Sequence, residues 1–434
     1  MNSRSVRGHP GWWRTAVVGI VGGLLVAACG GGATSGQGQQ AASGPPIKIG
    51  VLNDISASPP EGAEMRTNTD LAVAQINAAG GIHGHKLEVT YEDPGNATDK
   101  AISLAQQLVQ QQNVDVLIGG ILSSECLGVS PLAKSLGVVY MPSSGCASDV
   151  LTSKQCSSNT FRVSPEGQQT ILPLSSYIVR TYGDKWGILY PDYALGTSQL
   201  ASYTAGIQAA GGQIVGSQSI KIPFMPAAPS MAPYVSQIKT DGSINGVINA
   251  EVSNDLVRVS DTMAQFNIAS KLKIVGVFGK ERFKGVYPDS LNGDIGQSPE
   301  LSNDPNNKFD VAYHKAFRQQ LAKEPAVVQN TLGGNQAVPG DLGYEAYTTM
   351  TALKEAMLKS NFTGRADTQK LIPALAHLKA PQGADFPGGA FQMDPNNHQG
   401  AQTTYIAKIN GQNEQVLATI PANKLPSIGG NCHV

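Results

Sequence analysis

Serine and glycine residues follow two predicted strands, at positions where an α/β protein binds small ligands. The first pair follows the apolar run 114–118, and the others follow the run 138–141. Backbone N–H groups and helix N-termini at such strand ends favour anions, and serine hydroxyls can donate further hydrogen bonds. For the first two serines, the alternative role is helix capping. The candidate ligand-binding residues here are Ser123, Ser124, Ser143, Ser144, Gly145 and Cys146.

Three further candidates have side chains suited to a ligand that carries hydrogen-bond donors. Tyr193 lies in a loop that should face the ligand cleft, although it could only cover a hinge. Glu251 follows an apolar strand end, where a salt bridge between lobes is an equal alternative. Glu281 stands among basic neighbours, so a solvated charge cluster is its alternative.

Patterns typical of catalysis or metal binding do not occur. His83 and His85 form an HxH pair in a glycine-rich turn, with no third ligand nearby, and this is a poor metal site. The sequence contains no GxSxG, HExxH, Walker loop or CxxC pair, and no nucleophile stands beside a base. We therefore expect no enzyme activity, no metal and no cofactor.

The candidate residues require a frame of alternating strands and helices. Apolar runs at 47–52, 87–91 and 114–118 alternate with helical patterns at 61–79 and 99–111, which predicts a parallel sheet. After Cys156 the pattern begins again, so we expect a second lobe of the same architecture. The runs 391–393 and 404–409, separated by Asp-Pro-Asn-Asn, are typical of a final hairpin.

The N-terminal segment indicates export and lipid anchoring. Basic residues precede an apolar segment of signal-peptide length, which ends in Val26-Ala27-Ala28-Cys29, typical of a lipobox. A transmembrane anchor is the alternative. We expect a signal peptide over 1–28, lipidation at Cys29 and a flexible tether over 29–46. This places the protein at the cell membrane, facing the periplasm or cell exterior.

Charge and cysteine usage agree with an exported body. The 434-residue chain has a formal net charge of −1, and loss of the three leader arginines leaves −4, which argues against a nucleic-acid partner. Four cysteines remain after Cys29, so two disulfides are expected, with three possible pairings. Because a short loop closes first, we predict Cys146–Cys156, which leaves Cys126–Cys432 by elimination.

Several local strings resemble type I periplasmic solute-binding proteins of the leucine/isoleucine/valine-binding kind, over roughly 47–420. The two most specific strings are VAQINAAGGIHGHKLEVTYED at 73–93 and VDVLIGGILSSE at 114–125. Others are the 192–196 loop, VGVFGKE at 275–281 and GYEAY at 343–347. The resemblance implies two doubly wound parallel-sheet lobes joined by a three-crossing hinge. We expect lobe 1 to comprise 47–164 and 286–380, and lobe 2 to comprise 165–285 and 381–434.

The resemblance also implies roles for the candidate residues. In that family an amino acid lies between the lobes, with its carboxylate held by serine and backbone N–H groups and its ammonium by an acid of the second lobe. These roles fall on Ser123-Ser124 and 143–146, and on Glu281. Lys280 replaces the family's usual proline, Leu195 stands where an aromatic residue is common, and the loop 53–58 lacks the usual glycine.

The expected function is capture of a small polar solute, with a branched-chain or related amino acid first, and delivery to an ABC permease. A sensor of the same fold that binds amides, urea or aromatic acids is the first alternative. Neighbouring permease and ATPase genes would separate the two. A secreted hydrolase whose catalytic groups meet only in space is the second alternative, and binding without turnover would exclude it.

Overall fold

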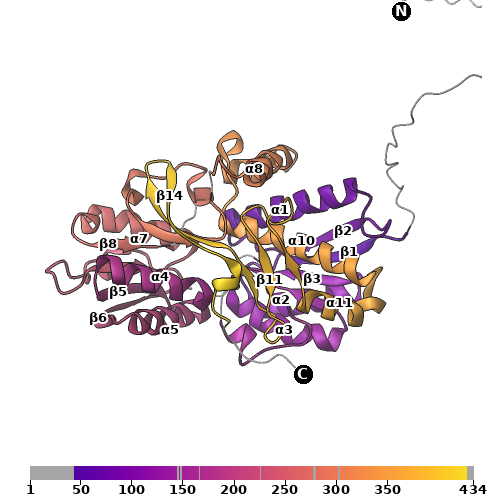
Figure 1. Cartoon of the computed structure of the whole chain (residues 1–434), viewed down its shortest axis with the longest axis horizontal. Coiled ribbons are helices and arrows are strands. Elements are labelled where there is room, and N and C mark those ends of the chain that lie inside the picture. The colour runs from indigo at the N-terminus through magenta and orange to yellow at the C-terminus, as the bar shows by residue number, and fades with distance from the viewer. Residues whose placement is uncertain are drawn as a thin grey trace, which may run out of the picture. The chain divides into compact units, whose positions relative to one another are not determined.

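The computed structural model describes residues 44–427, apart from 144–145, 147–148, 166, 225, 277–279 and 302–303 (Figure 1). The side chains of 253, 281 and 282 are also outside this description. The expected leader, Cys29, nearly all of the tether and Cys432 therefore lie outside the described residues. Within the described ranges, no helix has the length and apolar character needed to cross a membrane.

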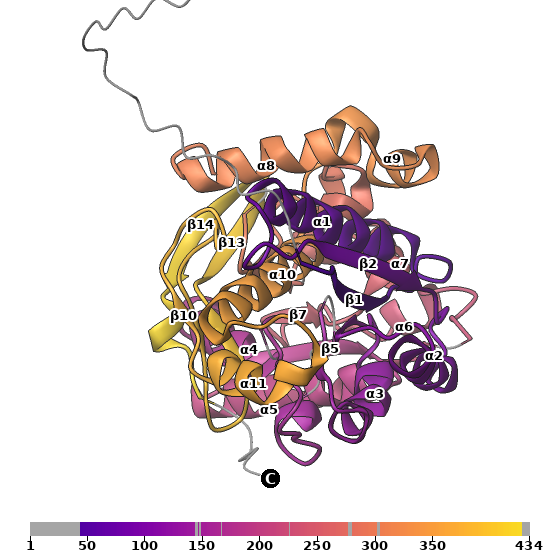
Figure 2. The same ribbon diagram turned by 90° about the vertical axis from the view of Figure 1, so that its right-hand side faces the viewer.

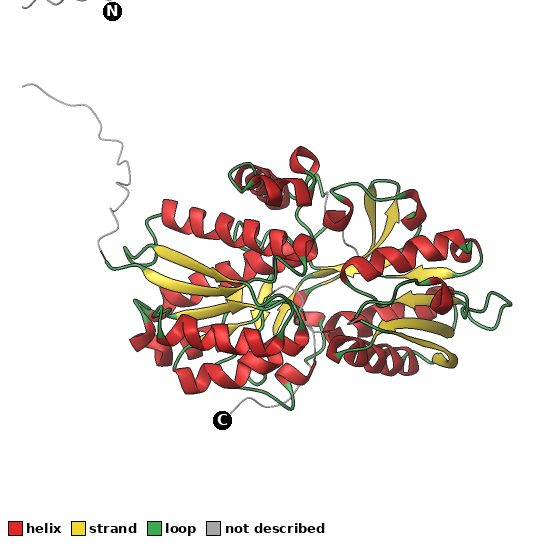
Figure 3. Ribbon diagram, turned by 180° about the vertical axis from the view of Figure 1, so that it is seen from behind, coloured by secondary structure: helices red, strands yellow, loops and turns green. Residues whose placement is uncertain are grey.

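The first lobe is built on a four-stranded parallel sheet of order β2-β1-β3-β4. The strands are β1 (Ile47–Leu52), β2 (Leu87–Glu92), β3 (Val116–Gly119) and β4 (Val139–Met141). They alternate with the helices α1 (Pro59–Ala78), α2 (Thr98–Gln110) and α3 (Ser123–Leu136). The apolar strand residues are buried because helices cover both faces of the sheet (Figure 3).

Later segments of the chain complete this lobe. After the second lobe, the chain returns through α8 (Lys308–Leu321), α9 (Ala326–Leu332), α10 (Asp341–Ser360) and α11 (Thr368–Ala376). Helix α10 lies alongside α1 (Figure 2), and its residues Tyr344, Met350 and Leu353 join β1 in the largest hydrophobic core. The first lobe is therefore assembled from segments far apart in the sequence.

The second lobe contains a seven-stranded sheet of order β14-β13-β9-β8-β7-β5-β6. Its parallel strands are β5 (Lys185–Pro191), β6 (Gln213–Ile222), β7 (Gly246–Asn249), β8 (Lys273–Val275) and β9 (Ile295–Ser298). The edge strands β13 (Thr404–Asn410) and β14 (Asn413–Ile420) are antiparallel. Its helices are α4 (Gly167–Tyr182), α5 (Ala194–Ala209), the short α6 (Ala232–Val235) and α7 (Ser253–Gln265). The predicted two-lobe α/β fold is confirmed.

A small sheet lies where the chain makes its last crossing. Strands β10 (Lys379–Ala380), β11 (Phe391–Met393) and β12 (Gly400–Gln402) pair antiparallel in that order. The predicted hairpin between 391–393 and 404–409 is wrong, because β11 pairs with β10 and β12, whereas β13 pairs with β9 and β14. Phe391 packs into the core of the first lobe.

The lobe limits differ from those expected at 285/286 and 380/381. Strand β9 belongs to the sheet of the second lobe, and β11 packs on the first. We therefore propose crossings at 164–167, 298–308 and 402–404. Arg162, beside the first crossing, donates from Nε to Gln399 Oε1 at 2.5 Å, which ties it to the segment before the third.

Candidate ligand-binding site

A cavity of about 150 Å³ lies between the two lobes. Its lining comes from the ends of strands and the first turns of helices, where an open parallel sheet exposes backbone N–H groups. The first lobe contributes Ser58, Glu61, Ile121, Leu122, Asp341, Leu342 and Glu345. The second lobe and the crossings contribute Ser164, Pro165, Gly167, Thr170, Ile171, Tyr193, Leu195, Gln199, Tyr203, Phe224, Val252, Gln297, Ser298 and Pro299.

Aromatic side chains form one wall of this cavity. Tyr193, directly before α5, stacks on Phe224 with ring centroids 4.3 Å apart and an interplanar angle of 13°. Burial raises the pKa of the Tyr193 hydroxyl above its usual range, and the carboxylates of Glu251, Glu61 and Glu125 raise it further. Tyr193 is therefore neutral, and it faces acidic groups from both lobes. Of the predicted candidates that the structure describes, Tyr193 is the one that lines the cavity.

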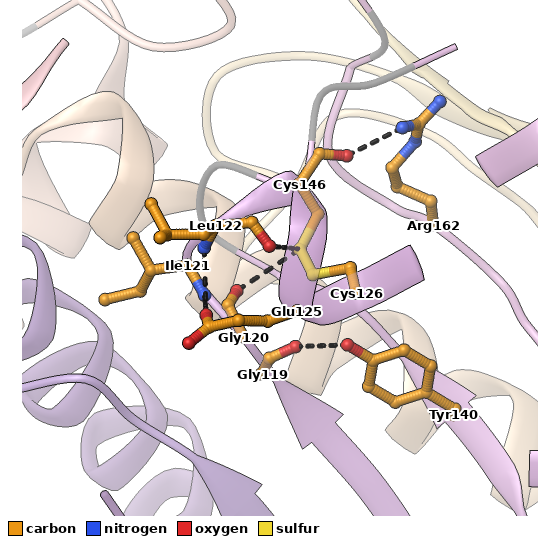
Figure 4. The surroundings of a disulfide bond; sticks show 9 residues. All are labelled: Gly119, Gly120, Ile121, Leu122, Glu125, Cys126, Tyr140, Cys146 and Arg162. Carbon is orange, nitrogen blue, oxygen red and sulfur yellow. Dashed lines mark hydrogen bonds between the residues drawn. A yellow bond between two sulfur atoms is a disulfide. The ribbon is translucent and has the colours of Figure 1, made fainter. Parts of the chain in front are cut away.

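The N-terminus of α3, predicted to hold an anion, is occupied by a side chain of the same helix. Glu125 Oε2 accepts from Ile121 N at 3.3 Å and from Leu122 N at 3.1 Å, in a capping box (Figure 4). Burial raises the pKa of Glu125 to about 8, and the neighbouring Asp54 carboxyl group adds to this. Burial raises the pKa of Asp54 as well. A protonated Glu125 can thus donate to Asp54 while its second oxygen caps the helix.

The predicted serines of this region do not line the cavity. Ser123 and Ser143 are buried, and their hydroxyl oxygens have no hydrogen-bond partner in the described part of the chain. Ser124 is half-buried. Ser144 and Gly145 lie outside the described residues. The structure brings Ser123, Ser143 and Cys146 to one end of the sheet, but a ligand role for them stays a prediction.

The predicted Cys146–Cys156 disulfide is wrong, because Cys146 is bonded to Cys126, and the pairing of Cys126 with Cys432 falls with it (Figure 4). Loop length alone favoured the nearer cysteine. In the folded lobe, however, the segment after β4 returns over the first turn of α3, and the two Cα atoms lie 6.2 Å apart. Arg162 Nη1 donates to Cys146 O at 2.6 Å and holds this return in place. Cys156 also takes part in a disulfide.

Glu251 occupies the corresponding strand end in the second lobe, two residues after β7. It is fully buried, and neither carboxylate oxygen has a partner among the described residues. Burial raises the pKa of Glu251 to about 8, with a further contribution from Asp255. Val252, the next residue, lines the cavity. The position predicted from the sequence is therefore at the cavity wall, with its hydrogen-bonding capacity unused.

The loop that carries Glu281 follows β8. The side chain of Glu281 lies outside the described part of the structure, so its role stays a prediction. Its neighbour Lys280 donates from Nζ to Gln412 O at 2.6 Å, an interaction that ties this loop to the turn between β13 and β14.

Sequence reasoning missed several cavity residues, above all Glu61, Phe224, Asp341 and Glu345. Glu345 lies inside the string used for the family resemblance, and Glu61 and Asp341 stand in first turns of helices. An acidic first turn is a general helix signal, so it did not distinguish these residues. Their convergence depends on the packing of α10 against α1, which no local pattern shows.

A second cluster of ionisable groups lies near the second crossing. Glu300, Asp310 and His314 are buried, and each presents a possible metal-ligand atom within 4.8 Å of the others. His314 Nε2 is hydrogen-bonded to Glu300 Oε1 at 2.5 Å. Burial lowers the pKa of His314 to about 3, so the imidazole is neutral. Because the nitrogen that a metal would need is already engaged, we interpret this cluster as a structural hydrogen-bonded group.

Comparisons with known proteins agree with this geometry. A family model described as "Periplasmic binding protein" matches residues 46–414. The Leu/Ile/Val-binding protein homolog 6 of Brucella suis biovar 1 (strain 1330) is 22% identical over 374 residues, which cover 84% of this chain and 87% of that protein.

Two solved structures have a similar fold. One is the solute binding protein of an ABC transporter from Rhodopseudomonas palustris BisB5 in complex with 3,4-dihydroxy benzoic acid; it has a TM-score of 0.74 and 20% identity, and the match covers 88% of this chain and 98% of that one. The other is a branched chain amino acid ABC transporter periplasmic ligand-binding protein from Burkholderia xenovorans LB400. It has a TM-score of 0.69 and 18% identity, with 88% replaced here by 87% of this chain and 96% of that one covered.

Proposed function

Because this chain belongs to the periplasmic binding protein family, we propose that it is the extracytoplasmic substrate-binding component of an ABC importer. Membership confirms the predicted family and a solute-binding rather than catalytic role. The observation that carries the proposal is the cavity between the lobes, to which helices α1 and α10 of one lobe and the start of α5 of the other all contribute.

The mechanism follows from this shared lining. A solute that contacts both walls realises its full binding free energy only when the lobes are closed, so it shifts the population toward the closed form. The permease can then recognise closure rather than the solute itself. Delivery to ABC permease subunits is therefore part of the proposal.

The size and lining of the cavity favour a small organic solute with an apolar part. Tyr193, Phe224 and Leu195 provide apolar surface, whereas Glu61 and Glu345 provide hydrogen-bond acceptors. We propose the amino-acid class expected from the sequence as the starting point, supported by the name of the Brucella relative. The ammonium end is the part of such a ligand that these side chains match best.

Attachment to the membrane is a further part of the proposal. Lipidation of Cys29 would hold the protein on the outer face of the membrane, with 29–46 as a tether. Replacing Cys29 with Ala should leave the protein unprocessed or released, as measured by membrane fractionation and mass spectrometry. A cleaved, acylated variant in the membrane fraction would contradict this.

The test of the proposed function is a thermal-shift screen of the purified mature protein against neutral, anionic, zwitterionic and cationic small solutes. A ligand at about 100-fold over its Kd stabilises by roughly 2.7 kcal/mol. Small-angle scattering should show compaction with each hit, and Tyr193→Ala should weaken the binding by at least about tenfold. Phe266→Ala, at an exposed aromatic on α7, is the control. No hit in any class, or hits without compaction, would contradict the function.

A further inference from the structure

The charged residues of the cavity share one sign. Glu61 lies in the first turn of α1, and Asp341 and Glu345 lie in the first two turns of α10. They are the charged residues among the described lining residues, and all three are acidic. Glu251 lies directly beside the lining on the opposite wall. A ligand between these walls therefore meets carboxyl groups from both lobes.

The hydrogen-bonding groups without partners at the cavity are mainly acceptors. Both carboxylate oxygens of Glu251 lack a donor in the described part of the chain, and so do the side-chain oxygens of Gln199 and Gln297. Glu251 and Gln199 are at least nine-tenths buried, so solvent cannot easily supply the missing donors. A buried acceptor without a donor is costly. The group that completes these walls must therefore bring N–H or O–H donors.

The aromatic wall favours the same chemistry. The stacked rings of Tyr193 and Phe224 both line the cavity. The face of an aromatic ring attracts a cation, by roughly 0.5 to 2 kcal/mol according to its desolvation. The rings also provide a flat apolar surface for the body of a ligand.

A ligand carboxylate, in contrast, finds its expected position filled. Glu125 caps the N-terminus of α3 through Ile121 N and Leu122 N, and Asp54 lies beside it. Ile121 and Leu122 line the cavity. An incoming carboxylate at this end would therefore displace one buried carboxyl group and lie close to another, which like-charge repulsion disfavours.

We infer that the cavity selects a small protonated organic amine that has an apolar or aromatic body and no carboxylate. The ammonium group would donate to the acidic wall, and the body would lie against Tyr193 and Phe224. The inference rests on the proposed solute-binding function and specifies its substrate class.

The experiment compares ligands that share a carbon skeleton but differ in charge. Calorimetry on the mature protein at pH 7 would use 3-methylbutylamine, leucine and 4-methylpentanoate, and in parallel tyramine, tyrosine and 4-hydroxyphenylacetate. The amine of at least one series should bind at least about tenfold more tightly than its amino acid, and the acid should not bind measurably. Tighter binding of an amino acid or an acid would overturn the inference and leave the solute-binding function intact. Absence of binding by both amines would also overturn it.

Isosteric variants locate the effect in the cavity. Glu345→Gln and Glu61→Gln should each weaken amine binding by at least about tenfold, with Glu88→Gln, on the exposed side of β2, as the matched control. Amine binding unchanged in both cavity variants would overturn the inference. If a variant fails to fold, as judged by its melting temperature without ligand, the ligand series on the unaltered protein decides.

Proton release provides a readout that simple packing of the amine would not produce. At pH 7 the raised pKa of Glu251 keeps much of this group protonated. An ammonium bound beside it favours the carboxylate, so binding should release a fraction of a proton. Calorimetry of the amine in Tris and in phosphate buffer should then give different apparent enthalpies, and Glu251→Gln should reduce the difference.

Discussion

The strand-to-helix junctions of the two lobes are built alike but use their acidic residue differently. In the first lobe, Glu125 follows β3 by six residues and lies inside the first turn of α3, where it caps the backbone of its own helix. In the second lobe, Glu251 follows β7 by two residues and precedes α7, and both of its oxygens lack a partner in the described structure.

The difference in position decides the role of each group. An acid within the first turn can reach back to the free N–H groups of the helix, whereas one before the helix points past them. In α7 the first-turn acid is Asp255, which forms an ion pair with Arg258 at 2.7 Å. The first junction is therefore self-sufficient, and the second leaves a buried carboxyl group available to a ligand.

Loss of the disulfide should have the largest effect on this comparison, because it ties only the first junction. Replacing Cys126 and Cys146 together by Ser removes a crosslink with a sequence separation of 20, which is expected to cost about 3 kcal/mol. Urea unfolding followed by circular dichroism should show the loss.

Tryptophan fluorescence separates the two lobes in this experiment. The chain has three tryptophans, and two of them lie in the predicted leader, so buried Trp186 of β5 reports on the second lobe. Its transition should shift less than the circular dichroism transition. Equal shifts of both signals would show that the lobes unfold as one unit.

Removal of the first-lobe cap should have the next largest effect. Glu125→Ala leaves two buried N–H groups without their acceptor and should destabilise by about 2 kcal/mol. Glu125→Gln keeps an acceptor and removes the unfavourable approach to Asp54, so it should change stability by less than about 1 kcal/mol. Equal losses in the two variants, measured by urea unfolding, would contradict the capping role.

The smallest effect concerns Glu251 and depends on pH. Because its pKa is about 8 in the folded protein, against a reference of 4.5, the folded state retains a proton that the unfolded state loses between these values. Stability from this group is present at low pH and falls as pH rises from about 4.5 to 8. Glu251→Gln should therefore raise the melting temperature at pH 8.5, by roughly 2 °C or more, and change it little at pH 4.5. The same increase at both pH values would contradict this.

Much of the fold could be predicted from the sequence, because apolar runs and glycine stops are local signals. Strands β1, β2 and β3 and helices α1 and α2 lie within a few residues of their predicted positions. The hairpin was wrong because β11 and β13 belong to different sheets, and strand pairing is a non-local property.

The site was harder to predict for a related reason. Tyr193 and Glu251 were found because they follow strand ends, which a sequence pattern locates. Glu61 and Glu345 come from helices separated by more than 250 residues, and only the packing of α1 on α10 brings them to one wall. The capping by Glu125 was missed because the expectation considered the serines of that turn and not the acid after them.

That packing has a consequence for the entropy of binding. Gly343 of α10 lies so close to α1 that a Cβ atom there would overlap Glu64, and Glu64 Oε2 in turn accepts from Gly340 N at 3.1 Å. Helices in such close contact cannot slide or separate without losing buried contacts. Glu61, Asp341 and Glu345 are thus carried on a preassembled scaffold before any ligand arrives. A ligand then has little of this wall left to order, so more of its interaction energy remains as affinity and as the force that closes the lobes.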